Sequence, residues 1–349
     1  MAESSLSALL TAVHATGAAT VPTCLSGARS AFGGVPVAIA VAAAERALFH
    51  HRAAAAGATV AAAAATASLP PLRVLHTSFV APVFPGPVTT TATVIRQGRS
   101  AAVVRAEALQ GDQVVTAVTA TFGAPKPSAR PSLVPARLAA TIPSWRATPP
   151  FVPSEAAPAP AGAAEASSSH DHWQRLTPPT FLAAMDVRYV KGGPRADGTI
   201  DAPQSPFEPE IGLWMRWKDD AATGGPSGAG GGTVAAAVTS LAPLAGPHAS
   251  ARFVALCDMT WPPPVARLAG RGILVASLAW SFEFFPPAPT AAVAATPMVT
   301  EAGWIYHAAS LCSAGDGYTS LTTHTFDTHG AMRAAARQTL AYWDTASKL

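Results

Sequence analysis

The residues best suited to bind a metal ion are the histidines and the aspartate of the HDH sequence at positions 170–172. A zinc site needs about four such donors, and no further ligands stand nearby in the sequence. Cys24, Cys257 and Cys312 are odd in number, far apart and without CxxC spacing. That pattern argues against a zinc site and a disulfide framework and indicates reduced intracellular thiols. We expect no metal and favour a solvated linker at 170–172, with a metal site as the alternative.

Two other common chemistries lack their sequence motifs. The glycine-rich segment 219–233 has the composition of a phosphate-binding loop but not its GK[ST] ending, so a flexible insertion is favoured. The chain has no dinucleotide-binding fingerprint, and no cofactor is expected. It also has no GxSxG sequence, which argues against a serine nucleophile of the hydrolase type.

The composition predicts a soluble protein. The chain has 349 residues, of which 12% are charged, and a net charge of +3. That length is sufficient for two domains. Charged residues such as Glu45 and Arg46 interrupt the most apolar region, so no membrane span of about 20 residues is expected. The start lacks the cationic region of a secretory signal. The sequence has no basic patch interleaved with aromatic residues, so it gives no indication of nucleic acid binding.

The elements that must position any active site are clearest between residues 72 and 125. Apolar and polar residues alternate there in short runs bounded by glycine, proline and aspartate, which predicts successive antiparallel strands. A long apolar segment upstream predicts a helix. A buried helix followed by a curled meander is an α+β unit. The predicted helix is 35–55, and the predicted strands are 75–80, 88–95, 101–109 and 114–122.

The second half of the chain repeats this order. A segment rich in proline, alanine and serine, residues 126–177, reads as a linker between a first unit, 1–125, and a second, 178–349. We expect the sheets of the two units to be joined edge to edge, because pairing covers strand edges that would otherwise be exposed. The predicted helix is 248–259, and the predicted strands are 181–190, 210–217, 273–285, 303–312, 318–325 and 331–342.

Three segments of the first unit carry a resemblance to a known family. These are FGG at 32–34, SFVAPVFPGPV at 78–88 and GRSAAVVRAEALQGDQVVTAVTATF at 98–122. In order and spacing they resemble the hotdog-fold acyl-CoA thioesterases of the bacterial thioesterase II type. The resemblance implies two tandem hotdog units in one chain, a double hotdog. It also implies hydrolysis of acyl-CoA to a free acid and CoA, in fatty acid metabolism. A homo-oligomer is expected.

The resemblance further implies three catalytic residues in the second unit. Asp258 lies at the end of the predicted helix, Ser277 on the following strand and Gln338 on the last strand. Together they would hold and activate the water that attacks the thioester. Each alone could equally be a helix cap, a backbone-bonded serine or an exposed glutamine. Burial at the helix end is expected to raise the pKa of Asp258. Residues 278–281 depart from the acidic-His-Ser stretch of the family, which bears on acyl preference.

Three residues of the first unit are candidates for substrate binding. Gly33 and Gly34, before the predicted helix, could direct backbone N–H groups toward a carbonyl oxygen, or could permit close helix–sheet packing. Arg99, in the turn at 97–100, could contact a phosphate of CoA or be solvated. The alternatives to a thioesterase are an inert acyl-CoA-binding protein and a hotdog hydratase, although the Asp–His pair of the hydratases is not found.

The tripeptide Ser347, Lys348 and Leu349 is the address read by the peroxisomal import receptor. In some protists the same tripeptide directs proteins to glycosomes. A short polar spacer precedes it, so the tail is expected to be accessible. We therefore expect import into peroxisomes or glycosomes, with the import receptor as a partner.

Overall fold

The computed structural model describes residues 6–27, 30–57, 59, 69–124, 181, 184–191, 211–217, 248–259, 273–285, 304–327 and 331–344. Several segments discussed above lie outside these residues. They are the linker 126–177 with its HDH sequence, the glycine-rich segment 219–233, and the tripeptide Ser347, Lys348 and Leu349. The interpretations of these segments, and the proposed domain boundaries, stay predictions.

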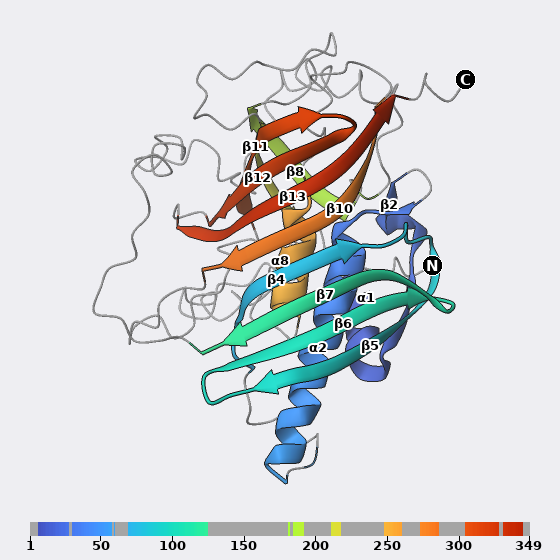
Figure 1. Cartoon of the computed structure of the whole chain (residues 1–349), viewed down its shortest axis with the longest axis vertical. Coiled ribbons are helices and arrows are strands. Elements are labelled where there is room, and N and C mark those ends of the chain that lie inside the picture. Colours follow the sequence, from blue (N-terminus) through green and yellow to red (C-terminus); the bar gives the residue numbers. More distant parts are fainter. Residues whose placement is uncertain are drawn as a thin grey trace, which may run out of the picture.

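One antiparallel sheet contains eleven of the described strands (Figure 1). The order across it is β1-β5-β6-β7-β4-β10-β13-β12-β11-β9-β8. The first group comprises β1 (Ala18–Val21), β4 (Leu72–Phe79), β5 (Gly86–Gln97), β6 (Ala101–Gln110) and β7 (Gln113–Gly123). The second comprises β8 (Met185–Lys191), β9 (Ile211–Trp217), β10 (Ile273–Phe284), β11 (Ile305–Gly315), β12 (Tyr318–Phe326) and β13 (Met332–Asp344).

The two groups meet where β4 pairs with β10. The register runs from Ala279 opposite Ser78 to Glu283 opposite Val74. Neither strand is therefore an edge, and the sheet continues from one group into the other. Tight turns such as the one between β6 and β7 join sequence neighbours into hairpins. In each group the chain then returns to its start, because β7 pairs with β4 and β13 pairs with β10.

Two helices lie against one face of the sheet. In Figure 1, α2 (Gly34–Ala55) crosses behind β4 to β7, and α8 (Ala249–Cys257) lies beside it. The alanine content of α2 favours a helix and lets it pack closely. The chain also forms α1 (Leu6–Thr16), a short 3-10 turn (Thr23–Leu25), and the paired short strands β2 (Ser26–Gly27) and β3 (Ser30–Ala31). The elements α1, β1, β2 and β3 were not predicted from the sequence.

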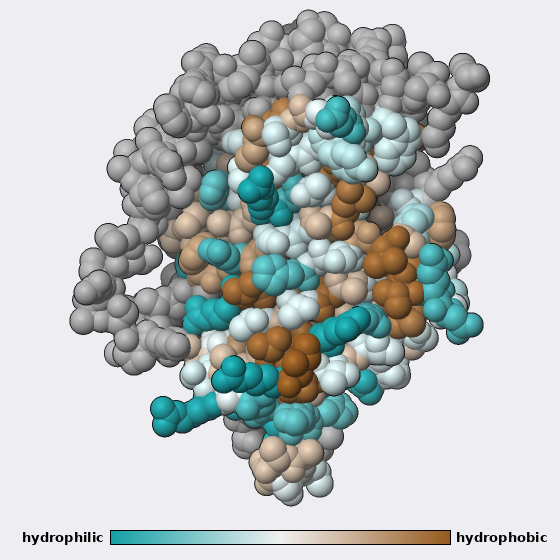
Figure 2. Space-filling model, in the orientation of Figure 1, coloured by the Kyte–Doolittle hydropathy of each residue, from teal (hydrophilic) through white to brown (hydrophobic). Residues whose placement is uncertain are grey.

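The core lies between the helices and the sheet. Along β6 the alternate residues Ala102, Val104, Ala106 and Ala108 are buried, whereas the residues between them are more exposed. The opposite face of the sheet is mostly hydrophilic, with separate apolar patches (Figure 2). This one-sided burial is what alternation in the sequence predicts. Among the described helices, none is both long enough and apolar enough to cross a membrane.

Candidate active site

Asp258 lies at the C-terminal end of α8, as its C-cap residue. The preceding residues, among them Phe253 and Leu256, are buried in the core, and they carry Asp258 inward with them. Only 8% of Asp258 is exposed. An acidic residue so deeply buried is uncommon unless it has partners, and its partners define the candidate site.

The side chain of Gln338 joins two of the predicted residues. From β13, its Nε2 donates hydrogen bonds to Asp258 Oδ1 at 2.8 Å and to Ser277 Oγ on β10 at 2.9 Å. Residues that lie 80 and 61 positions apart in the sequence thus form one polar cluster. The structure brings Asp258, Ser277 and Gln338 together at one place beneath the sheet.

A β-bulge in β10 orients Ser277 toward this cluster. Ser277 pairs with Leu340 and Trp280 with Gln338, and the register shifts between Ser277 and Ala279. Without the extra residue, Ser277 and Trp280 would lie on opposite faces, because side chains alternate along a strand. The bulge places both on the face that carries Gln338.

Burial raises the pKa of Asp258 to about 7, because the charged form loses its hydration. Hydrogen bonds from the Gln338 side chain and from the Gly34 backbone N–H act in the opposite direction. The expected rise in the pKa of Asp258 is thus present. A carboxyl group that titrates near neutrality can accept a proton from water and return it within one catalytic cycle.

Two polar groups of the cluster can still bind a ligand. Ser277 accepts from Gln338, which leaves its hydroxyl hydrogen able to donate elsewhere. Gln338 Oε1 is buried, and no donor from the described residues reaches it. With the Asp258 carboxylate, these groups can orient a water molecule next to an electrophile.

Gly33 and Gly34 lie where α2 begins, against the end of α8. A Cβ atom on Gly34 would collide with the backbone of Ala255, and one on Gly33 would lie 2.6 Å from Asp258 Oδ2. The glycines therefore permit close contact between α2 and α8, whereas the contact expected from the sequence was with the sheet. The N–H of Gly34 is bonded to the Asp258 carboxylate. That contact was not predicted.

Arg99 is exposed in the turn between β5 and β6. It lines a cavity of about 110 Å³ together with Leu48 and Arg52, from the C-terminal part of α2. Along the axis of α2, Leu48 lies some 21 Å from Gly34, the residue that contacts Asp258, at a rise of ~1.5 Å per helical residue. The structure thus places Arg99 apart from Asp258 and its partners.

The stretch that departs from the family pattern, residues 278–281, faces both sides of the sheet. Trp280 is buried, whereas Leu278 and Ser281 are exposed. Ser281 Oγ lies 3.1 Å from Nδ1 of His76 on β4, across the joint between the two strand groups. Of this stretch, Trp280 is the buried residue that pairs with Gln338.

Two family models match the chain. The model of the acyl-CoA thioesterase N-terminal domain matches residues 21–123, and that of the C-terminal domain matches residues 153–342, more than half of the chain. The second match contains Asp258, Ser277 and Gln338. No curated protein matches the chain.

Solved structures resemble the whole chain at low sequence identity. A conserved protein of unknown function with a hotdog fold from Alicyclobacillus acidocaldarius has a TM-score of 0.54 and 18% identity, covering 93% of this chain and 92% of its own. The TesB protein of Mycobacterium avium subspecies paratuberculosis has a TM-score of 0.52 and 16% identity, covering 96% and 99%. An acyl-CoA thioesterase II from Mycobacterium marinum has a TM-score of 0.53 and 16% identity, covering 95% and 93%. These likenesses show the hotdog fold.

Proposed function

This chain belongs to the acyl-CoA thioesterase family, and from that premise we propose that Asp258, Ser277 and Gln338 are its catalytic residues. The enzyme hydrolyses acyl-CoA thioesters to a carboxylic acid and CoA. One observation carries the assignment. The Gln338 amide bridges a hydroxyl and a buried carboxyl group whose pKa is about 7.

In the proposed mechanism the Asp258 carboxylate takes a proton from water as the water oxygen attacks the thioester carbonyl carbon. The tetrahedral intermediate then collapses, the C–S bond breaks, and the sulfur takes the proton back from Asp258. The Gln338 amide keeps the carboxylate in place, and the Ser277 hydroxyl orients the water. No covalent acyl-enzyme forms, and Asp258 ends the cycle ionised, as it began.

The test of this function is hydrolysis of an acyl-CoA panel of increasing chain length, measured with the wild type and with Asp258→Asn. Removal of a general base costs ~10²–10⁴-fold in rate, so kcat should fall far more than KM rises. The rate of the wild type should rise with pH, reach half its maximum near pH 7, where half of Asp258 is ionised, and level off above that pH. Wild-type protein that binds acyl-CoA without turnover would support the alternative of an inert binding protein. Near-normal turnover in Asp258→Asn would overturn the residue assignment.

We propose, further, that the chain is a double hotdog with units at 1–125 and 178–349. The support is the pair of family models, one for each half, together with the pairing of β4 with β10. Limited proteolysis within 126–177 should yield two fragments that remain associated during size-exclusion chromatography. Fragments that separate under native conditions would contradict this arrangement.

We also propose import into peroxisomes or glycosomes, and assembly as a homo-oligomer. Import is supported by the tripeptide Ser347, Lys348 and Leu349. A fluorescent protein fused ahead of residue 1 should give punctate fluorescence, and deletion of Leu349 should make it diffuse. Unchanged puncta after the deletion would contradict import by this route. Light scattering of the purified chain measures the oligomeric state, and a monomeric mass would refute assembly.

A further inference from the structure

A cavity of about 440 Å³ lies between the C-terminal half of α2 and β5, at the far end of the helix from Asp258. Its polar lining is cationic or neutral, with Arg46, His50 and His51 from α2 and Thr90 from β5. Alanines of α2, Ala43 and Ala47, complete the helix side. Arg46 follows Gly34 by about 18 Å at ~1.5 Å per helical residue, so the cavity is distinct from the candidate active site.

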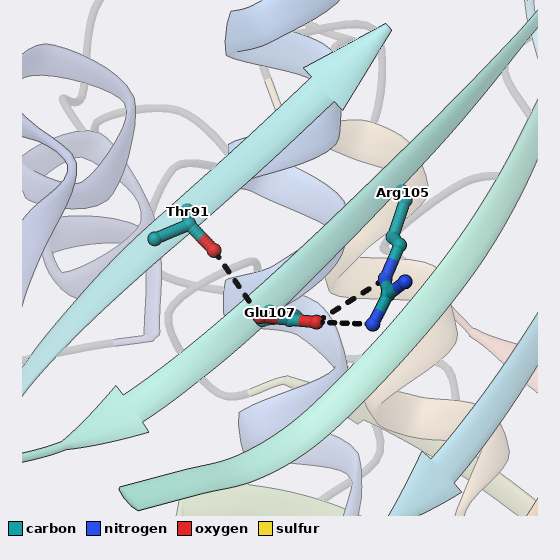
Figure 3. Close-up of polar contacts among 3 residues, drawn as sticks. All are labelled: Thr91, Arg105 and Glu107. Carbon is teal, nitrogen blue, oxygen red and sulfur yellow. Dashed lines mark hydrogen bonds and ion pairs between the residues drawn. The ribbon is translucent and has the colours of Figure 1, made fainter. Parts of the chain in front are cut away.

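Arg46 has no counter-charge among the described residues. Its Nε is buried, and no hydrogen-bond acceptor from that part of the chain reaches it. The adjacent Glu45 is bonded to Ser250 of α8, on another side of the helix. Glu107 belongs to the opposite face of the sheet, where it accepts from Thr91 and pairs with Arg105 (Figure 3). A guanidinium group with a buried, unpaired N–H favours an anionic ligand.

Further basic groups surround Arg46. His14 of α1 is half-buried, and burial lowers its pKa, with the positive charges of Arg46 and His50 acting in the same direction. His50 and His51 are exposed at the cavity. Because a lowered pKa keeps His14 uncharged near pH 7, Arg46 is the group that makes the electrostatic potential in this cavity positive.

Gly17 lies next to Arg46 and holds Thr90, one of the residues that line the cavity. Its φ of +78° is one that glycine adopts readily, and its carbonyl accepts hydrogen bonds from both the N–H and the hydroxyl of Thr90, each at 2.9 Å. A Cβ atom on Gly17 would lie 3.4 Å from Arg46 Nη1. The turn thus gives the guanidinium group room without covering it with a side chain, and it fixes one wall of the cavity.

We propose that the cavity between α2 and β5 is a binding site for phosphate groups, independent of the proposed hydrolytic site. The planar guanidinium group can bind two phosphate oxygens at once, and the imidazoles and the Thr90 side of the cavity surround the rest of the anion. The volume falls within the ~300–1,000 Å³ range of small-molecule sites and exceeds that needed for one inorganic anion. The ligand class is a small phosphorylated molecule. The phosphate could be free or borne by a nucleotide.

Isothermal titration calorimetry of the full chain at low ionic strength tests this site with two probes, inorganic phosphate and adenosine 3′,5′-bisphosphate. Arg46→Gln should weaken binding of either probe at least tenfold. Arg105→Gln is the matched control, because it removes the same charge from the neighbouring strand on the opposite face, and it should change affinity less than twofold. Tighter binding of the bisphosphate by tenfold or more identifies a nucleotide source. Similar affinities identify free phosphate.

Ala47→Leu provides a second variant, since it fills the cavity and keeps the arginine. It too should weaken binding at least tenfold, with an unchanged far-ultraviolet circular dichroism spectrum. In phosphate-free buffer, Arg46→Gln should have a Tm equal to or above that of the wild type, because it removes a charge that no described residue neutralises. Phosphate should no longer raise the Tm of this variant. The proposal is overturned if the wild type binds neither probe, if Arg46→Gln binds both with wild-type affinity, or if its Tm falls in phosphate-free buffer. Acyl-CoA hydrolysis is measured separately, so the two proposals can fail independently.

Discussion

The antiparallel pair α2 and α8 has a buried carboxyl group at each end, and the two differ in their surroundings. Asp258 lies where α8 ends against the start of α2, and Glu45 lies where α8 begins. Each is about 8% exposed, and burial raises the pKa of each to about 7. By titration alone, both would qualify as general bases.

The hydrogen-bond partners of Asp258 and Glu45 distinguish the two carboxyl groups. The hydrogen bond that lowers the pKa of Glu45 comes from Ser250, on the neighbouring helix. Asp258 is bonded to Gln338 on the sheet, and Gln338 in turn is bonded to Ser277. A raised pKa follows from burial, whereas catalysis also needs groups that hold water in position. Hydrogen bonding to the sheet, rather than burial in the helix pair, therefore distinguishes Asp258, the proposed catalytic carboxyl group, from Glu45.

The largest expected difference is in turnover. Asp258→Asn should lower kcat by ~10²–10⁴-fold, and Glu45→Gln should leave it within about twofold, because the Glu45 side chain lies away from Ser277 and Gln338. Steady-state kinetics with one acyl-CoA substrate makes the comparison. Equal losses in the two variants would show that burial, and not the sheet partners, sets the role.

The next effect is on stability as a function of pH. The carboxyl pKa of Glu45 rises from an ordinary 4.5 to about 7 in the folded chain, so the folded state holds a proton that the unfolded state releases between these values. The stabilisation is complete below pH 4.5 and is lost as pH rises to about 7, by on the order of 3 kcal/mol. Glu45→Gln should flatten this decline, because the amide does not titrate. Urea denaturation at a series of pH values measures the decline in the free energy of unfolding. An equally steep decline in Glu45→Gln would contradict the claim that Glu45 is buried in its protonated form.

A smaller effect is expected where the helices touch. Gly34→Ala places a methyl group against the backbone of Ala255, so the free energy of unfolding should fall by about 1–3 kcal/mol. Because the Gly34 N–H also binds Asp258, kcat should fall as well. Gly98→Ala is the control, since its Cβ would meet the Ala101 carbonyl oxygen at an ordinary 3.5 Å. Gly34→Ala with wild-type stability would show that the helices can separate without loss.

The smallest effect concerns the hydroxyl group. Ser277→Ala removes the hydroxyl group that is proposed to orient the attacking water, and it should lower kcat by about tenfold, equivalent to about 1.4 kcal/mol. Ser281→Ala is a matched control on the same strand, because Ser281 is exposed and bonded to His76. Its kcat should stay at the wild-type value. A loss shared equally by both variants would assign the effect to the strand rather than to the bulged position.

Much of the fold could be predicted because its information is local. Alternation and turn residues predicted β4 to β7 and β9 to β13 to within a few residues, and a long apolar run predicted α2. The helix α1 was missed, although Leu6, Leu9, Leu10 and Val13 have helical spacing and are all buried. The short strands β1 to β3 depend on distant partners and have little local pattern.

The site could be predicted only in part. The resemblance to the family named Asp258, Ser277 and Gln338 as candidates, and the structure brings them together. No local pattern distinguished them from a cap, a strand serine or an exposed glutamine. The bulge after Ser277 is set by pairing with β13, some 60 residues later, so periodicity cannot reveal it. From the sequence alone, Arg46 is recognised only as a charged residue that interrupts an apolar segment. Its cavity, and the lack of a counter-charge from the described residues, arise from packing between a helix and a strand.

The pairing of β4 with β10 also makes the chain a natural candidate for division into two cooperating pieces. A cut between the strand groups would turn both strands into open edges with unsatisfied N–H and C=O groups. Each piece could then pair with its counterpart or with another copy of itself. Only the mixed assembly would place Gly34 of one piece against Asp258 of the other. Recovery of hydrolysis would therefore report reunion of unlike halves, and the enzyme could serve as a split reporter of its own assembly.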